Sequence, residues 1–87
     1  MSDKVAVHPR VHARHPEIRD EDACMAWGNA IAMVNRTYSP PDIYAAAGLD
    51  GKGRMLELLG VELDDGSVLV FHAMKLTRKM SEELGLV

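Results

Sequence analysis

Two short segments of the chain combine histidine with cationic side chains. The first contains the adjacent pair Arg14-His15. The second contains one histidine followed by three cations: His72, Lys75, Arg78 and Lys79. Imidazole accepts or donates a proton near neutral pH and a neighbouring cation can hold a phosphate, so each segment suits acid–base cleavage of a phosphodiester. An ordinary polar helix end is the alternative interpretation of the first pair.

Arg54 follows the glycine-rich turn Gly51-Lys52-Gly53 and opens an apolar segment. A guanidinium at a strand entry can bind phosphate through two parallel hydrogen bonds. It can equally be a surface charge paired with a neighbouring acid. His72 alternates with Val68 and Val70, so we expect it on their face of a strand, as part of a site or as a hydrogen-bonded core residue.

His8, His12 and His15 are spaced four and three residues apart, which would align them on one face of a helix. Three imidazoles so placed could bind zinc, and surface histidines without a metal are the alternative. The single cysteine, Cys24, excludes an internal disulfide and a cysteine-rich zinc site.

Thr77 is a suitable N-cap for a last short helix, whose apolar residues recur at every fourth position: Leu76, Met80 and Leu84. The first turn carries Arg78 and Lys79, and the end carries Glu82 and Glu83. This order is the reverse of what the helix dipole favours. We therefore expect the cations to serve an anion rather than the stability of the helix.

The chain has 87 residues, 47% of them hydrophobic, which fits one globular domain over residues 1–87. Its core is thin for this size, which favours self-association. The net charge of −3 argues mildly against nucleic acid as a partner, although the cations would form a local patch if the two chain ends meet. No secretory or membrane-spanning segment is evident, so we expect a cytoplasmic protein without a membrane partner.

The helices expected near the start of the chain follow from its apolar spacing. A short helix is expected over residues 8–15 and ends at Pro16. A longer helix is expected from Asp20 to Val34, with acids in its first turn. Its core-facing stripe is Ala23, Ala26, Trp27, Ala30, Ile31 and Val34.

Strands are expected over residues 43–47, 54–63 and 68–73, joined by hairpin turns at 50–53 and 64–66. Residues 1–7 are either a ragged start or a short edge strand. The predicted fold class is α+β, with N-terminal helices, an antiparallel meander of three or four strands and a short C-terminal helix. The simplest packing places the helices on one face of the sheet.

Three segments carry a resemblance to a known family: HARHPEIRDEDACMAW, AAAGLDGKGRMLELLGV and LVFHAMKLTRKMSEELG. They resemble, in order, the opening, the middle, and the last strand with its following helix in BrnT-type toxins, which belong to the RelE-like superfamily of toxin–antitoxin ribonucleases. The chain departs from that pattern at Pro16, where the family commonly has glycine, and after Ala73, where it lacks the usual arginine.

The resemblance implies a RelE-like fold and a bacterial type II toxin. Such a toxin is an endoribonuclease that cleaves RNA without a metal or other cofactor, inhibits translation and is held in check by a cognate antitoxin protein. The catalytic positions that the resemblance implies are Arg14, His15, Arg54 and His72. The cations expected to bind the RNA substrate are Lys52, Lys75, Arg78 and Lys79.

Two other classes of function stay open. A non-catalytic protein-interaction module of the same fold fits the acidic net charge, and would bind its partner through a methionine-rich surface of Met25, Met33, Met55, Met74 and Met80. A small metal-binding protein would use the histidine cluster.

Overall fold

The computed structural model of the chain describes residues 4–37 and 39–87. In chain order the elements are β1 (Val5–Val7), α1 (Pro9–Arg14), α2 (Asp20–Gly28), β2 (Ala30–Asn35), β3 (Ile43–Leu49), β4 (Met55–Glu62), β5 (Val68–Lys75) and α3 (Arg78–Glu83). No helix in the described ranges is long and apolar enough to span a membrane.

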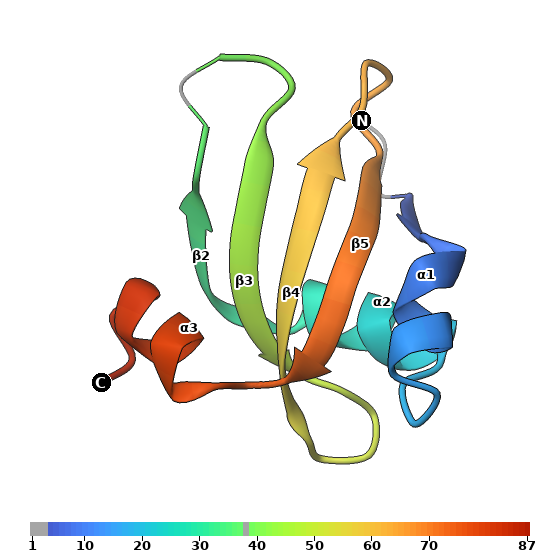
Figure 1. Cartoon of the computed structure of the whole chain (residues 1–87). Coiled ribbons are helices and arrows are strands. Elements are labelled where there is room, and N and C mark those ends of the chain that lie inside the picture. Colours follow the sequence, from blue (N-terminus) through green and yellow to red (C-terminus); the bar gives the residue numbers. More distant parts are fainter. Residues whose placement is uncertain (1–3, 38) are drawn as a thin grey trace.

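The strands form one five-stranded mixed sheet in the order β1-β5-β4-β3-β2 (Figure 1). β2 to β5 make an antiparallel meander, and β1 joins the edge of β5 in parallel. The α+β class is therefore confirmed. The strand count of three or four was wrong, because both β1 and β2 belong to the sheet.

The second half of the predicted long helix is a strand. α2 ends at Gly28, and Asn29 turns the chain into β2. Along β2 the residues alternate between half-buried and exposed, with Ala32 and Val34 facing the interior. The stripe at Ala30, Ile31 and Val34 fits a helix and a strand almost equally. The weak helix formers at residues 28 and 29 let the helix end there, and pairing with β3 favours the strand.

The helices cover both faces of the sheet, which corrects the expectation of one covered face. On one face Val11, Ile18, Ala23 and Ala26 pack against the strands. On the other face α3 places Met80 and Leu84 against the alanines of β3. In Figure 1 α1 and α2 lie on the right and α3 on the left. The small side chains of Ala45, Ala46 and Ala47 let helices approach β3 from both sides, which explains why this alanine-rich segment is a central strand.

The end of α2 lies directly on β3. A Cβ atom at Gly48 would stand 1.9 Å from the backbone oxygen of Ala26, so only glycine fits at this crossing. Gly60 likewise makes room for the ring of Trp27, which would lie 2.8 Å from an added Cβ. These two glycines fix how closely α2 can approach the sheet.

A bulge in β5 changes the face on which His72 lies. His72 pairs with Leu59 and Val70 pairs with Gly60, so Phe71 is an extra residue in the ladder. Val70 packs in the core beneath α1 and α2, whereas Leu59 packs in the core beneath α3. The alternation with Val68 and Val70 therefore predicted the wrong face, because one inserted residue reverses the order of side chains.

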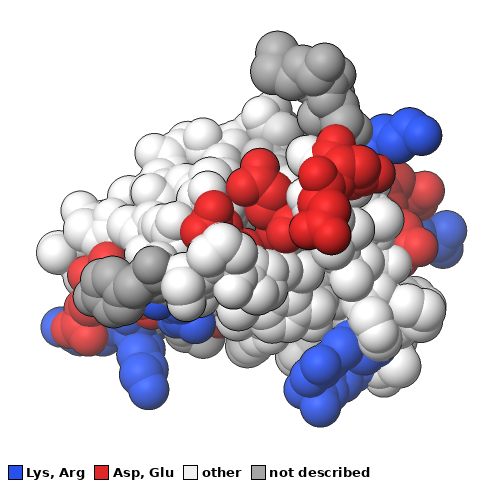
Figure 2. All heavy atoms as spheres, turned by 90° about the horizontal axis from the view of Figure 1, so that it is seen from above, with Lys and Arg blue, Asp and Glu red and all other residues white. Residues whose placement is uncertain are grey.

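One end of the sheet carries a cluster of acidic side chains. The loop before β3 and the turn between β4 and β5 carry Asp42, Glu62, Asp64 and Asp65. Figure 2, which views the molecule from above, shows the acidic side chains gathered at this end. Because β5 runs away from this end, His72 and the start of α3 lie toward the opposite end.

Candidate functional site

His15 and His72 lie close together although 57 positions separate them in the chain. Their ring centroids are 6.5 Å apart, with the ring planes nearly perpendicular at 87°. His15 follows α1, and His72 lies in β5, against which α1 packs. Both side chains are between a quarter and a third exposed, so both rings reach solvent. The structure thus brings together the two histidines that the sequence analysis selected.

A buried carboxylate fixes the ring of His72. Nε2 of His72 lies 2.9 Å from Oε2 of Glu57, whose side chain is only 7% exposed. The other oxygen of Glu57 accepts hydrogen bonds from the backbone N–H and the hydroxyl of Thr77, at 2.9 and 2.6 Å. The N-cap of α3 and the last strand are therefore joined through one carboxylate.

Hydrogen bonds keep Glu57 ionised. Burial alone would raise the pKa of Glu57, but hydrogen bonds from Thr77 and His72 outweigh it and hold the pKa below its usual value. An ionised carboxylate only accepts hydrogen bonds, so Nε2 of His72 must carry the proton that it shares with Glu57. In the neutral ring this leaves Nδ1 as a proton acceptor.

A hollow of about 210 Å³ opens beside this pair. Its lining residues come from β4, β5, α3 with its N-cap, and the residue that follows β2: Arg36, Glu57, Leu59, His72, Thr77, Lys79, Met80 and Glu83. Arg36 forms a two-pronged ion pair with Glu83 across the hollow, and this contact raises the pKa of Arg36 and lowers that of Glu83. The ion pair also gives Glu83, an acid at the unfavourable end of α3, a partner that stabilises it.

The other predicted cations surround the two histidines unevenly. Arg14 is exposed beside His15, and Lys79 lines the hollow beside His72. Lys75 is exposed on the opposite face of β5 from His72, since it pairs with Leu56. Arg78 is 87% exposed and lies 3.8 Å from Glu82. In the described part of the chain, the side chains of Arg14 and Lys75 form no hydrogen bond or ion pair.

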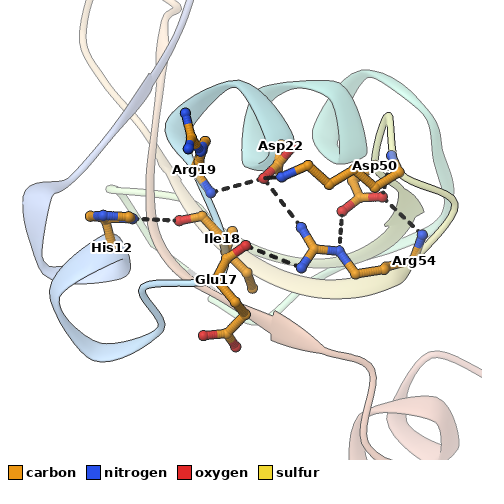
Figure 3. Close-up of polar contacts among 8 residues, drawn as sticks. His12, Glu17, Ile18, Arg19, Asp22, Asp50 and Arg54 are labelled. Carbon is orange, nitrogen blue, oxygen red and sulfur yellow. Dashed lines mark hydrogen bonds and ion pairs between the residues drawn. The ribbon is translucent and has the colours of Figure 1, made fainter.

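Arg54 is not part of this cluster. Its guanidinium is held by Asp50 at 2.7 Å, by Asp22 at 3.2 Å and by the backbone oxygen of Glu17 at 3.1 Å (Figure 3). These contacts join the β3–β4 turn to the start of α2 and to the loop before it. Lys52 completes the network with an ion pair to Asp22 at 3.2 Å.

The two aspartates of this network are almost fully buried and ionised. The backbone N–H of Arg19 is the main cause of the lowered pKa of Asp22. Burial would raise the pKa of Asp50, but hydrogen bonds from Arg54 and Lys52 lower it overall. A buried carboxylate needs such partners. The contacts of Arg54 therefore give it a structural task, holding the turn against α2.

The histidines of the N-terminal segment separate in the structure. His8 caps α1 by accepting a hydrogen bond from the backbone N–H of Arg10. His12 lies 2.9 Å from the backbone oxygen of Ile18 (Figure 3). His15 turns toward His72. Among the described residues, no three His, Cys, Asp or Glu side chains are arranged to hold a metal ion.

Sequence reasoning missed Glu57, Thr77 and Arg36 as members of the site. Glu57 had a usable signal, because it is the one charged residue within the otherwise apolar run from Met55 to Val61. The five methionines predicted to form one surface lie in different parts of the structure. Met25 and Met33 are exposed, Met80 is buried, and Met55 and Met74 pack against different cores.

Comparisons of the chain with protein-family models, curated proteins and solved structures found no match.

Proposed function

We propose that the chain is a metal-independent endoribonuclease that uses His15 and His72 as a general acid–base pair. The observation that carries this proposal is the 6.5 Å separation of the two rings, with His72 anchored on a buried carboxylate. Two imidazoles at this spacing can flank a single phosphodiester. Acid–base chemistry at such a group needs one proton acceptor and one proton donor within reach of the same phosphate.

The hydrogen bond between His72 and Glu57 supports one division of the two roles. Nδ1 of neutral His72 accepts the proton of a ribose 2′-hydroxyl as that oxygen attacks the adjacent phosphorus. Protonated His15 then donates its proton to the departing 5′-oxygen, and a 2′,3′-cyclic phosphate forms. The carboxylate of Glu17 lies beside this ring, with its Oε2 3.8 Å from Nδ1 of His15.

Cations beside the rings would stabilise the negative charge that develops on the phosphorane. Arg14 precedes His15 in the chain and Lys79 lines the hollow beside His72, so we assign them this task, with Arg78 binding a flanking phosphate. Lys75 lies on the opposite face of β5 from His72 and is given no role in this scheme. Arg54 and Lys52 have no step in this scheme, because their charges already face Asp22 and Asp50.

We place this activity in the toxin of a bacterial type II toxin–antitoxin pair. The sequence likeness to BrnT-type toxins supports this setting, in which RNA cleavage inhibits translation and a cognate antitoxin protein suppresses it. Induced expression of the chain would then arrest growth. Expression of His72→Ala would not.

The direct test uses the purified chain and an RNA oligonucleotide, with a copy carrying 2′-deoxyribose at the cut site. Cleavage in the presence of EDTA, a cyclic phosphate product and an intact deoxy copy support the proposal. A well-folded chain that leaves the RNA intact would reject it.

A non-catalytic interaction module of the same fold is the second candidate. Ion pairing of Arg54 and Lys52 favours it, because it leaves fewer open cations than an RNA site usually has. Capture of a tight protein partner without RNA cleavage would support this alternative, and cleavage that depends on His15 would reject it.

A further inference from the structure

β2 is an edge strand, and its outer side carries backbone groups that the sheet leaves open. The backbone N–H of Arg36 donates to Ile43 at 2.8 Å, which fixes the alternation of the ladder with β3. In an antiparallel pair every second residue bonds the neighbouring strand. Ala32 and Val34 therefore bond β3, while the N–H and C=O groups of Met33 and Asn35 point outward.

The side chains of β2 add an apolar stripe beside this open edge. Ile31 is 60% exposed and Met33 is 43% exposed. The register pairs Met33 with Ala46, a residue of the core beneath α2, so Met33 extends that face of the sheet beyond the helix. Large apolar side chains exposed next to unpaired backbone mark a place where another strand can pair.

Beyond its first residues the strand has few of the features that normally protect an edge. Its sequence, Ala-Ile-Ala-Met-Val-Asn, contains no charge and no proline. The one irregularity lies between Ala30 and Ala32, which leaves the following residues regular. At the other edge of the sheet, β1 is only three residues long.

The charge distribution favours an antiparallel copy as the occupant. Asp42, Glu62 and Asp64 line one hollow between the loop before β3 and the β4–β5 turn. Figure 1 shows β2 running toward this end of the sheet, and Figure 2 shows a cluster of acidic side chains there. Two parallel copies would bring these acidic ends together, whereas an antiparallel pair keeps them apart, at opposite ends of the joined sheet. A two-fold axis perpendicular to the sheet also brings the apolar stripes of both copies onto the same face.

We propose that the chain forms a symmetric dimer in which the β2 strands of two copies pair antiparallel and join their sheets into one. Ile31 and Met33 of each copy pack against the same residues of the other. β4 and β3 lie between β5, which carries His72, and β2, so the His15–His72 pair of each copy stays away from the paired edge.

Sedimentation over a concentration series, combined with amide hydrogen exchange, tests this dimer. As the dimer forms, exchange at the Met33 and Asn35 amides slows at least tenfold, whereas exchange at Ala32 and Val34 is already slow in the monomer. Met33→Lys gives a folded monomer. Leu63→Lys, a matched change at a residue 42% exposed in the β4–β5 connection, stays dimeric.

Three results would overturn the proposal. One is a wild-type chain that stays monomeric at every concentration. Another is a dimer that survives Met33→Lys with unchanged exchange at residues 33 and 35. The third is protection of these amides only when a different protein is added, which would assign the edge to that partner.

Discussion

Glu57 Oε2 lies 2.9 Å from Nε2 of His72, and this contact sets which nitrogen of the histidine can accept a proton. Because Glu57 is buried and ionised, it holds the ring with Nδ1 free for chemistry. The same carboxylate accepts two hydrogen bonds from Thr77, the N-cap of α3.

Glu57→Gln should lower RNA cleavage about 100-fold while leaving the fold intact. The amide oxygen can still accept from Thr77, but the amide NH₂ then faces His72 and favours the opposite tautomer, with the proton on Nδ1. Single-turnover cleavage measures the loss, and circular dichroism checks the fold. Wild-type cleavage by this variant would show that Glu57 does not set the tautomer.

Arg54→Met should destabilise the fold by about 2–4 kcal/mol, because it removes the only side-chain cation that pairs with buried Asp50 among the described residues and one of the two that pair with buried Asp22. Urea unfolding measures this change. Lys52→Met is the matched control and should cost less than about 1 kcal/mol, since that side chain is 53% exposed. A stable Arg54→Met chain that has lost cleavage would instead assign Arg54 to the chemistry.

The stability of the fold should decrease in acid. Folding lowers the pKa of Asp22, Asp50 and Glu57, so each contributes stability that is complete above its unfolded pKa of about 4. That stability disappears as the pH falls through the lower folded pKa. The unfolding free energy should therefore be level above about pH 5 and should fall below it.

Asp50→Asn tests how much Asp50 contributes to the loss of stability in acid. It removes one titrating group, so the dependence of the unfolding free energy on pH should weaken by at most about 1.4 kcal/mol per pH unit. Unfolding by urea at several pH values measures the slope. An unchanged acid slope in this variant would contradict the role given to Asp50.

Gly48→Ala should unfold the chain or cost more than about 3 kcal/mol, since the new methyl group would overlap the backbone oxygen of Ala26. Gly28→Ala makes the same chemical change at the end of α2, where nothing lies within 4 Å of the added Cβ. It should be neutral or stabilise by about 0.5–1 kcal/mol. Thermal unfolding compares the two, and equal tolerance would contradict the close crossing of α2 and β3.

The sequence predicted those parts of the fold that local signals specify. Pro9 opens α1, Thr77 caps α3, and the two turns between β3, β4 and β5 lie where the glycines place them. The end of α2 was missed because the apolar residues from Ala30 to Val34 fit both the 3.6-residue period of a helix and the two-residue period of a strand. Pairing with β3 decides between them, and that pairing is not a local property.

The site was predicted in part, for a similar reason. His15 and His72 could be selected by type, and β5 brings them together. The bulge at Phe71, which turns His72 toward Glu57, depends on how β5 aligns with β4. Arg54 was selected for its position after a turn, but its partner Asp22 lies 32 positions earlier, in a helix whose contact with the turn could not be inferred.

The most direct test of the central claim is the pH dependence of RNA cleavage by the wild-type chain, His15→Ala, His72→Ala and the double variant. We predict that the cleavage rate of the wild-type chain follows a bell-shaped curve against pH. Each single variant should lose one limb of this curve, and its cleavage rate should fall about 100-fold or more. The double variant should lose little more than either single one, because the two rings act on the same phosphate. A folded wild-type chain that does not cleave RNA, or single variants that cleave RNA with the wild-type pH profile, would contradict the roles proposed for His15 and His72.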